Sequence, residues 1–258
     1  MKKLLLVFII FFNTWVFGQD LNQIEKKLFD LNVKRVFWSY DQSLSAHDSL
    51  DNYNAEIKDF ILDFSSKHKQ TLNHPFKSVN QGFDIVSSAD GLFRIYSWNE
   101  FAGGTMQFYQ NVFQYNIGGK VYSKLNEKRN QDSGHRFYDL NEVSVDGKKY
   151  YITSSIVIGS SAVYYYQAKV FSIKNGKLNE NAKLIKTKTG LKNTLGYEVD
   201  LSSSANRNRN DGVVSMDYME LIYDKKTQTI VIPLIKADGK VTKNKIKYRF
   251  TGKYFEKM

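Results

Sequence analysis

The spacing of apolar residues divides the chain into a helical beginning and a longer part that is rich in strands. Between residues 19 and 70, apolar residues recur every three or four positions, as in helices that bury one face. Two series show this spacing: Leu21, Ile24, Leu28 and Leu31, then Tyr53, Ile57, Phe60, Ile61 and Phe64. We expect two helices here, the second with Asp48 or Ser49 as its N-cap. The polar segment 65–81, which contains Pro75, is expected to link them to the rest.

After residue 82 the pattern changes to short runs of Val, Ile, Tyr, Phe and Thr, separated by turns that contain glycine. Tight hairpin turns favour glycine because they need a positive φ. Six turns are predicted, at Asp90-Gly91, Gly118-Gly119, Asp146-Gly147, Asn175-Gly176, Asp211-Gly212 and Asp238-Gly239. Successive turn glycines lie 27 to 36 residues apart, which leaves room for a strand, a second turn and a returning strand. The expected class is mainly β (α+β), with an antiparallel meander sheet or sandwich over 82–258 and a β-propeller as the alternative.

Several predicted strands carry apolar side chains on both faces. In the run 106–115, Phe108 and Val112 alternate with Tyr109, Phe113 and Tyr115. The run 163–173 has the same character, with Tyr164 and Tyr166 against Tyr165, Phe171 and Ile173. Strands with two apolar faces need cover on both sides. The N-terminal helices are the expected cover for part of one face.

The last predicted strand separates charged from apolar residues most cleanly. Four cations alternate with four other residues: Lys243, Lys245, Lys247 and Arg249 against Asn244, Ile246, Tyr248 and Phe250. A period of two places the cations on one face, about 7 Å apart. Two interpretations stay open: an edge strand whose lysines oppose aggregation, or a face that binds an anionic partner. Lys236, Lys240 and Lys253 lie nearby in sequence and enlarge the same basic surface.

The first 18 residues have the composition of a secretory signal peptide. Lys2 and Lys3 precede an apolar run over residues 4–12, and Val16 and Gly18 provide the slim side chains that signal peptidase needs. The apolar stretch is short of the roughly 20 residues that span a bilayer. We expect cleavage after Gly18, export to the periplasm or the outside, and a mature chain without a membrane-spanning segment.

Composition narrows the chemistry of the mature chain. It has no cysteine and only four histidines among 258 residues, which excludes disulfides, thiolate metal centres, thiol nucleophiles and lipid attachment to cysteine. We expect neither a metal nor a cofactor. The net charge is +11, from 37 Lys and Arg against 26 Asp and Glu, and it falls to +9 without the two lysines of the leader. In an exported protein this charge favours an acidic protein or an anionic envelope component over nucleic acid, and plain solubility is the other explanation.

Motifs for catalysis or ligand binding are sparse. Trp98 stands close to Glu100 and Gly103-Gly104, where an indole can stack on a sugar and a double glycine lets a ligand approach the backbone. The alternative is a wide turn with Trp98 in the core. Tyr109 completes the candidates for a polysaccharide site. His135 is a lone histidine in a polar segment, for which a role as a base or a zinc ligand is the less favoured reading.

A polar loop over residues 206–212 superficially resembles a calcium loop. Calcium loops need several carboxylates at alternate positions, whereas this loop offers mainly asparagine and carries two arginines, Arg207 and Arg209. We expect an exposed loop whose arginines are able to contact an anionic partner.

Three segments also carry a resemblance: Leu92–Trp98, Gly103–Met106 and Tyr248–Glu256. Together with the leader that ends at Gly18, they resemble uncharacterised secreted, β-rich proteins of the Bacteroidetes type. The resemblance implies an address in the cell envelope. It implies no activity, and it assigns no catalytic residue to this chain.

These observations lead to one hypothesis and one alternative. We expect an exported, non-enzymatic envelope protein that binds a protein or another anionic partner through the basic strand or through Arg207 and Arg209. One version is an immunity-type protein that guards against an exported toxin. The alternative is a protein that binds or hydrolyses envelope polysaccharide with Trp98, Glu100 and Tyr109. Whether the chain is an enzyme stays open, although the missing motifs favour a binding protein.

Overall fold

The structure is a computed structural model of the full chain. It describes residues 2–41, 43, 45–128, 132–174, 176–207 and 216–258, with side chains from residue 21 onward except at 216 and 217. Strands make up 45% and helices 23%, and two N-terminal helices precede antiparallel sheets. The predicted mainly β class is therefore confirmed.

Long helices come first along the chain and the strands follow. The helical elements are α1 (Lys2–Tyr40), α2 (Ala46–Lys67), the 3-10 helix η1 (Lys69–Leu72), α3 (Ser204–Arg207) and α4 (Met216–Met219). The strands are β1 (Phe83–Ser87), β2 (Phe93–Asn99), β3 (Tyr109–Ile117), β4 (Lys120–Leu125), β5 (Arg136–Val145), β6 (Lys148–Ile158), β7 (Val163–Lys174), β8 (Lys177–Asn179), β9 (Ile185–Thr187), β10 (Gly190–Lys192), β11 (Thr194–Asp200), β12 (Ile222–Asp224), β13 (Thr229–Ile235), β14 (Val241–Phe250) and β15 (Phe255–Lys257).

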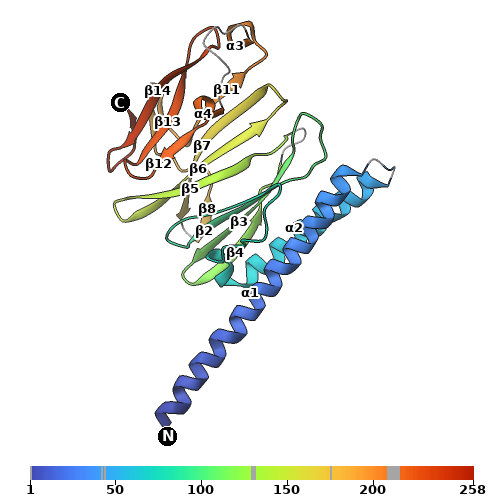
Figure 1. Ribbon diagram of the computed structural model, residues 1–258. Coiled ribbons are helices and arrows are strands. Elements are labelled where there is room, and N and C mark those ends of the chain that lie inside the picture. The colour runs from blue at the N-terminus through green and yellow to red at the C-terminus, as the bar shows by residue number, and fades with distance from the viewer. Residues whose placement is uncertain (1, 42, 44, 129–131, 175, 208–215) are drawn as a thin grey trace.

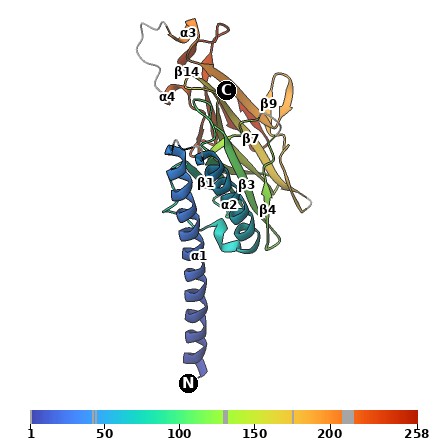
Figure 2. The ribbon, with the colours of Figure 1, turned by 90° about the vertical axis from the view of Figure 1, so that its right-hand side faces the viewer.

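The strands form three sheets that stack with the helices into four layers (Figures 1 and 2). Sheet A has the order β1-β2-β3-β4, sheet B the order β11-β7-β6-β5 with β8 beside β7, and sheet C the order β10-β9-β15-β14-β13-β12. Strand pairs are antiparallel except β15 with β9. Helices α1 and α2 cover sheet A, sheet B follows, and sheet C ends the stack. Across the described residues the sheets close into neither a barrel nor a propeller, so the propeller alternative is wrong.

Each pair of neighbouring layers encloses its own hydrophobic core. The core between the helices and sheet A includes Ile24, Leu28, Ile57, Ile61, Phe64, Tyr96, Trp98 and Val112. The core between sheets A and B includes Phe93, Ile95, Phe113, Phe137, Leu140, Tyr151 and Phe171. The core between sheets B and C includes Ile152, Tyr166, Val170, Ile185, Val199, Tyr223, Ile230, Ile232 and Phe255. Sheets A and B are thus buried on both faces.

Strands β3 and β7 show how the sequence builds this double burial. In β3, Val112 belongs to the core under the helices and its neighbour Phe113 to the core between sheets A and B. In β7, Tyr166 faces sheet C and Phe171 faces sheet A. Successive side chains of a strand point to opposite faces, so a strand with apolar residues at neighbouring positions contributes to two cores. The prediction of cover on both faces, with helices on one, is confirmed.

Ion pairs on the borders of these cores also join sheets A and B. Arg136 in β5 donates two hydrogen bonds to Asp84 in β1, at 2.7 and 3.0 Å. Glu180, just after β8, accepts hydrogen bonds from Lys124 of sheet A at 2.5 Å and from Lys169 of sheet B at 3.2 Å. These contacts fix the lateral position of one sheet on the other, which apolar contacts alone leave less defined.

The predicted glycine turns join consecutive strands, yet the strands do not form one sheet. Five turns lie where expected, and their glycines have φ between +58° and +90°: Gly91, Gly118, Gly119, Gly147, Gly176 and Gly239. The turn at 211–212 lies outside the described residues. The chain changes sheet after β4, after β8, after β10 and after β11. The meander is therefore local, and the single large sheet is divided into three.

The helix boundaries differ from the sequence prediction. Helix α2 begins at Ala46, so Ser45 precedes it and makes no side-chain cap hydrogen bond. The prediction of Asp48 or Ser49 as the N-cap is wrong; Asp48 lies in the first turn, where a negative charge favours the helix dipole. Helix α1 begins at Lys2 and includes the predicted leader, whose cleavage stays a prediction. Nowhere among the described residues does a helix have the length and apolar character needed to cross a bilayer.

Candidate functional site

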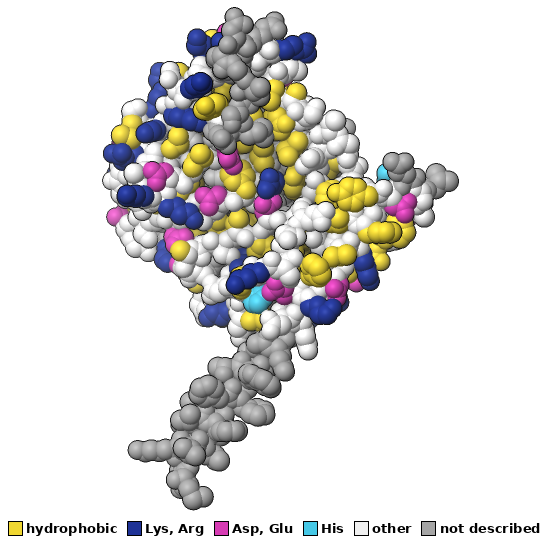
Figure 3. Space-filling model, viewed as in Figure 1, with side chains coloured by type: hydrophobic (Ala, Val, Ile, Leu, Met, Phe, Trp, Pro, Cys, Tyr) yellow, Lys and Arg dark blue, Asp and Glu magenta, His cyan; other side chains and the backbone are white. Residues whose placement is uncertain are grey.

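The four predicted cations of the last strand lie on the outer face of sheet C. Strand β14 alternates between partly buried Ile246, Tyr248 and Phe250, which pack on the core below, and the cations, which point the other way. Lys243, Lys247 and Arg249 are exposed and Lys245 is half-buried. Figure 3 shows Lys and Arg side chains gathered over the part of the molecule that holds β12, β13 and β14. We call these four residues the basic face.

The members of the basic face differ in their contacts. The Lys243 ammonium lies over the ring of Tyr218, 5.5 Å from its centroid, and Lys245 Nζ donates to the backbone oxygen of Tyr218 at 3.1 Å. Lys247 and Arg249 form no ion pair in the part of the chain that the structure describes. Two of the four cations are thus held at α4, and two project without a counter-charge.

Acidic residues close to the basic face are engaged elsewhere. Glu256 in β15 lies opposite Arg249, but its carboxylate binds Lys186 in β9. This hydrogen bond to Glu256 raises the pKa of the Lys186 ammonium. Asp224 accepts hydrogen bonds within its own turn, from Thr227 at 2.6 Å. Residues 222–258 carry ten Lys and Arg against three Asp and Glu, so the surface keeps a strong positive charge.

A hollow of about 420 Å³ lies beside the basic face on the same sheet. It is lined by Lys186, Thr187, Lys188, Tyr248, Glu256 and Lys257. Three of these side chains are lysines, and Tyr254 contacts Lys186 with its ring at 4.8 Å. The sequence carries no local signal for this hollow, because β9 and β15 are about 70 residues apart and only their parallel pairing brings Lys186 to Glu256.

Strand β14 is an edge strand over only part of its length. It pairs with β13 from Val241 onward, and its last three residues, Tyr248 to Phe250, also pair with β15. The chain reverses between Thr251 and Tyr254, a short turn in which Gly252 has φ +88°. The interpretation as an edge strand is therefore wrong for Arg249, and it applies only to the beginning of β14.

The described part of the polar loop over residues 206–212, which carries Arg207, lies near the start of β14. Arg207 is the exposed last residue of α3. Its neighbour Asn206 is buried, accepts a hydrogen bond from the Val241 backbone nitrogen at 3.0 Å, and donates to the Gly239 oxygen at 3.1 Å. These bonds anchor α3 to β14, so the structure brings Arg207 next to the strand that carries the basic face. Arg209 lies outside the described residues.

Trp98 belongs to the core and not to a surface site. Its side chain is fully buried between the helices and sheet A, stacked on Phe83 with ring centroids 5.7 Å apart. A buried indole offers no face to a sugar ring, so the prediction of Trp98 as a ligand-binding residue is wrong and the core alternative is correct. The sequence could not separate the two, because tryptophan is common both in cores and at binding surfaces.

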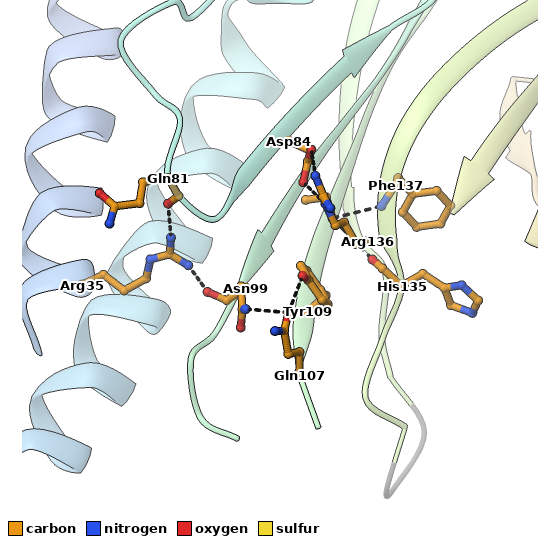
Figure 4. Close-up of polar contacts among 10 residues, drawn as sticks. Arg35, Gln81, Asp84, Asn99, Gln107, Tyr109, His135, Arg136 and Phe137 are labelled. Atoms are coloured by element: carbon orange, nitrogen blue, oxygen red, sulfur yellow. Dashed lines mark hydrogen bonds and ion pairs between the residues drawn. The ribbon is translucent and has the colours of Figure 1, made fainter. Parts of the chain in front are cut away.

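Asn99, the neighbour of Trp98 in sequence, belongs to a polar network with Arg35, Gln107 and Tyr109 (Figure 4). Arg35 of α1 donates to the backbone oxygens of Asn99 and Gln81, and burial lowers the pKa of its guanidinium to about 9. Asn99 donates to Gln107 Oε1 at 3.2 Å, and the Tyr109 hydroxyl donates to the same atom at 2.9 Å. These bonds tie α1 to sheet A, which is a structural role, although Arg35 Nε is buried without a hydrogen-bond partner among the described residues.

The other candidates for polysaccharide chemistry do not converge with Trp98. Glu100 forms an ion pair with Lys128, and Tyr109 is buried with its hydroxyl already bonded. His135 contacts Ser155 Oγ through Nδ1 at 3.1 Å, and burial lowers the pKa of its imidazole. Among the described residues no group of three His, Cys, Asp or Glu side chains is placed to hold a metal ion.

A second small cavity lies between sheets B and C. Its volume is about 140 Å³, and it is lined by Arg136, Tyr138, Ile156, Tyr166 and Glu220. The Tyr138 hydroxyl donates to the Leu221 oxygen at 2.7 Å, and burial raises the pKa of Tyr166 to about 12. Its lining combines two tyrosine rings with the guanidinium of Arg136 and the carboxylate of Glu220, which suits a small polar ligand. The sequence carries no signal for this cavity, because residues from separate strands line it.

Comparisons with protein-family models, with curated proteins and with solved structures found no match to this chain.

Proposed function

We propose that the protein is an exported, non-enzymatic binding protein of the cell envelope, and that the basic face of sheet C takes an acidic protein partner. The observation that carries the proposal is the outward projection of Lys247 and Arg249 without a counter-charge, in line with Lys243 and Lys245 along β14. An acidic exported toxin, held inactive as by an immunity-type protein, is one partner of this class.

The cost of leaving these cations unpaired supports the proposal. Two unit charges 7 Å apart repel by about 2 kcal/mol at an effective dielectric constant of 20, and solvent and salt reduce this value. A row of four such charges is tolerated in water but becomes favourable when an anionic surface meets it. Lys186, Lys188 and Lys257 around the adjacent hollow add further positive charge beside the basic face.

The shape of the surface favours a protein over a small anion. Sheet C has a row of cations in its middle, flanked by the exposed apolar side chains of Leu191 and Ile222 on its two outermost strands. Protein interfaces combine apolar contact with charge complementarity. A small anion would contact only one or two of the cations and neither Leu191 nor Ile222.

The test measures binding of a short poly-L-glutamate peptide, used as a defined acidic probe. Charge reversal of two residues, Lys247→Glu with Arg249→Glu, is expected to weaken binding about tenfold or more, because each interfacial charge contributes about 0.2–1 kcal/mol and reversal adds repulsion. The control is Lys148→Glu with Lys177→Glu, which changes the net charge equally at exposed positions of sheet B. This control should weaken binding by less than about threefold.

Salt and a neutral polymer complete the test. Binding should fall steeply between about 50 and 300 mM salt, since the screening length shortens over this range. An equal loss in both double variants would mean that only net charge matters, and the proposal would be overturned. Binding of a neutral polysaccharide that neither salt nor charge reversal changes would also overturn it.

A further inference from the structure

Helix α1 carries a stripe of exposed apolar side chains. Phe29, Val33, Phe37 and Tyr40 are 38%, 48%, 62% and 75% exposed, and they make up four of the seven exposed large hydrophobic residues among the described side chains. Figure 3 shows hydrophobic side chains along this end of the helix. We call these four residues the α1 stripe. A contiguous patch of exposed apolar side chains marks an interaction surface, whereas single scattered ones do not.

The α1 stripe lies on the side of the helix that faces away from the core. Leu28 and Leu31 are buried in the core between the helices and sheet A, and at about 100° per residue Val33 points away from both of them. Lys27 and Lys34 lie to one side, where their ammonium groups sit over rings of α2 at 4.5 and 5.7 Å. The stripe is therefore free of the two lysines that would otherwise cover it.

We propose that the α1 stripe pairs with the same stripe of a second copy of this chain, with the helices antiparallel and the two-fold axis at Val33. A two-fold interface requires a surface that is complementary to itself, so that residue i meets residue j and j meets i. The α1 stripe has this symmetry. Phe29 and Phe37 lie four residues before and after Val33, and they face each other across the axis in both directions.

The charges beside the stripe follow the same symmetry. Lys26 lies seven residues before Val33 and Tyr40 seven residues after it. Lys26 is exposed and pairs with Asp30 on its own helix at 2.9 Å, which holds its ammonium at the edge of the stripe. In the antiparallel pair this ammonium meets the ring of the second copy's Tyr40, a cation–π contact, with Asp41 one residue further on. Both contacts are attractive, and each occurs twice, whereas a parallel pair would place the lysines against each other.

The area of the stripe predicts a weak dimer. With roughly 150–250 Å² for each large side chain, the exposed fractions leave about 400 Å² per copy. Two copies thus bury about 800 Å², below the roughly 1,200–2,000 Å² of stable complexes and within the range of weak, transient ones. The expected dissociation constant lies at about 10–100 µM.

Cysteine cross-linking tests the arrangement directly, because the chain has no cysteine of its own. The Val33→Cys protein is purified with its N-terminus processed as in its own cell. Its only thiol lies on the two-fold axis, where the facing helices approach closely enough for a disulfide to form. We expect disulfide dimers to form at least about tenfold faster than in Leu191→Cys, an equally exposed control on sheet C. A mixture of Phe29→Cys and Phe37→Cys should cross-link faster than either protein alone.

Sedimentation equilibrium of the unmodified chain supplies the second measurement. Val33→Glu should abolish the dimer, because two carboxylates would meet on the axis, while Leu191→Glu should leave it intact. Far-UV circular dichroism checks that both variants fold. The proposal is overturned if the unmodified chain stays monomeric up to about 500 µM, or if Val33→Cys cross-links no faster than the control. It is also overturned if the stripe binds neutral phosphatidylcholine vesicles while the chain stays monomeric.

Discussion

Replacing Phe113 by alanine tests whether sheets A and B depend on a common core. Phe113 is fully buried, and its ring lies 5.5 to 6.0 Å from the rings of Phe93, Phe137 and Phe171. These neighbours come from both sheets. Because they are themselves held by their strands, they are poorly able to fill the space that the ring leaves.

The expected loss of stability follows from two contributions. Burying the side-chain atoms of phenylalanine beyond Cβ stabilises the fold by about 2 kcal/mol. A remaining cavity of about 80 Å³ costs about 2 kcal/mol more, at about 24 cal/mol per Å³. The free energy of unfolding of Phe113→Ala should therefore fall by about 4 kcal/mol. For a chain of this size the midpoint of thermal unfolding should fall by about 8–16 °C.

The assay is urea unfolding at pH 7, followed by far-UV circular dichroism. Phe113→Leu is the graded control, since it keeps most of the volume and should cost about 1–1.5 kcal/mol. Tyr40→Ala is the control for an exposed aromatic residue and should change stability by less than about 0.5 kcal/mol. A loss below about 1 kcal/mol for Phe113→Ala would refute the view that this ring joins the two sheets.

Two further variants test local features. Burial raises the pKa of Glu180, but the hydrogen bonds and charges of its two lysines outweigh this effect and hold the pKa below its usual value. The ion pairs therefore add stability at neutral pH, and this stability is lost as the pH falls through the lowered pKa. Glu180→Gln should cost about 1 kcal/mol at pH 7 and less at pH 3, and equal costs in urea unfolding at both values would contradict this. Gly134 has φ +75°, and a Cβ at this position would lie 2.1 Å from the backbone oxygen of Tyr109. The free energy of unfolding of Gly134→Ala should therefore fall by more than about 3 kcal/mol. The control is Gly118→Ala, which should lose about 1 kcal/mol, because Gly118 has φ +58° but open space around it. Similar losses for both variants would show that the close approach of Gly134 to the Tyr109 backbone is unimportant.

Local features of the fold could be predicted because they leave short-range patterns. The alternation at Val112 and Phe113 specifies a strand buried on both faces, and a glycine such as Gly147 specifies a hairpin. Both signals depend on residues only one or two positions apart. The spacing of three and four along α1 and α2 has the same local character.

The division into three sheets could not be predicted in this way. It depends on the connections after β4 and β8, which carry the chain to the next layer, and on pairs such as β15 with β9 that join distant segments. The segment 65–81 illustrates the same limit. The segment is mainly polar and was expected only to link the helices to the strands, yet Leu72, Phe76 and Val79 are buried.

The candidate site was predicted in part for related reasons. The cations of β14 are found from the period of two, and their projection away from the core follows from that pattern. The contribution of Lys186 depends on tertiary pairing and has no sequence signal. Trp98 was placed in two alternative environments by the sequence, and the packing of α1 and α2 on sheet A decides between them.

The layered order has a consequence for binding strength. Helix α1 and sheet C lie at opposite ends of the stack (Figure 1). Layers spaced by about 10 Å place sheet C about 30 Å from the axis of α1, so a pair joined through α1 would carry two basic faces about 70 Å apart, turned in opposite directions. The two faces could not close on one small acidic protein. Avidity would arise only on a target that repeats its acidic surface over that distance, such as an array or a polymer, while single acidic proteins would bind each copy independently.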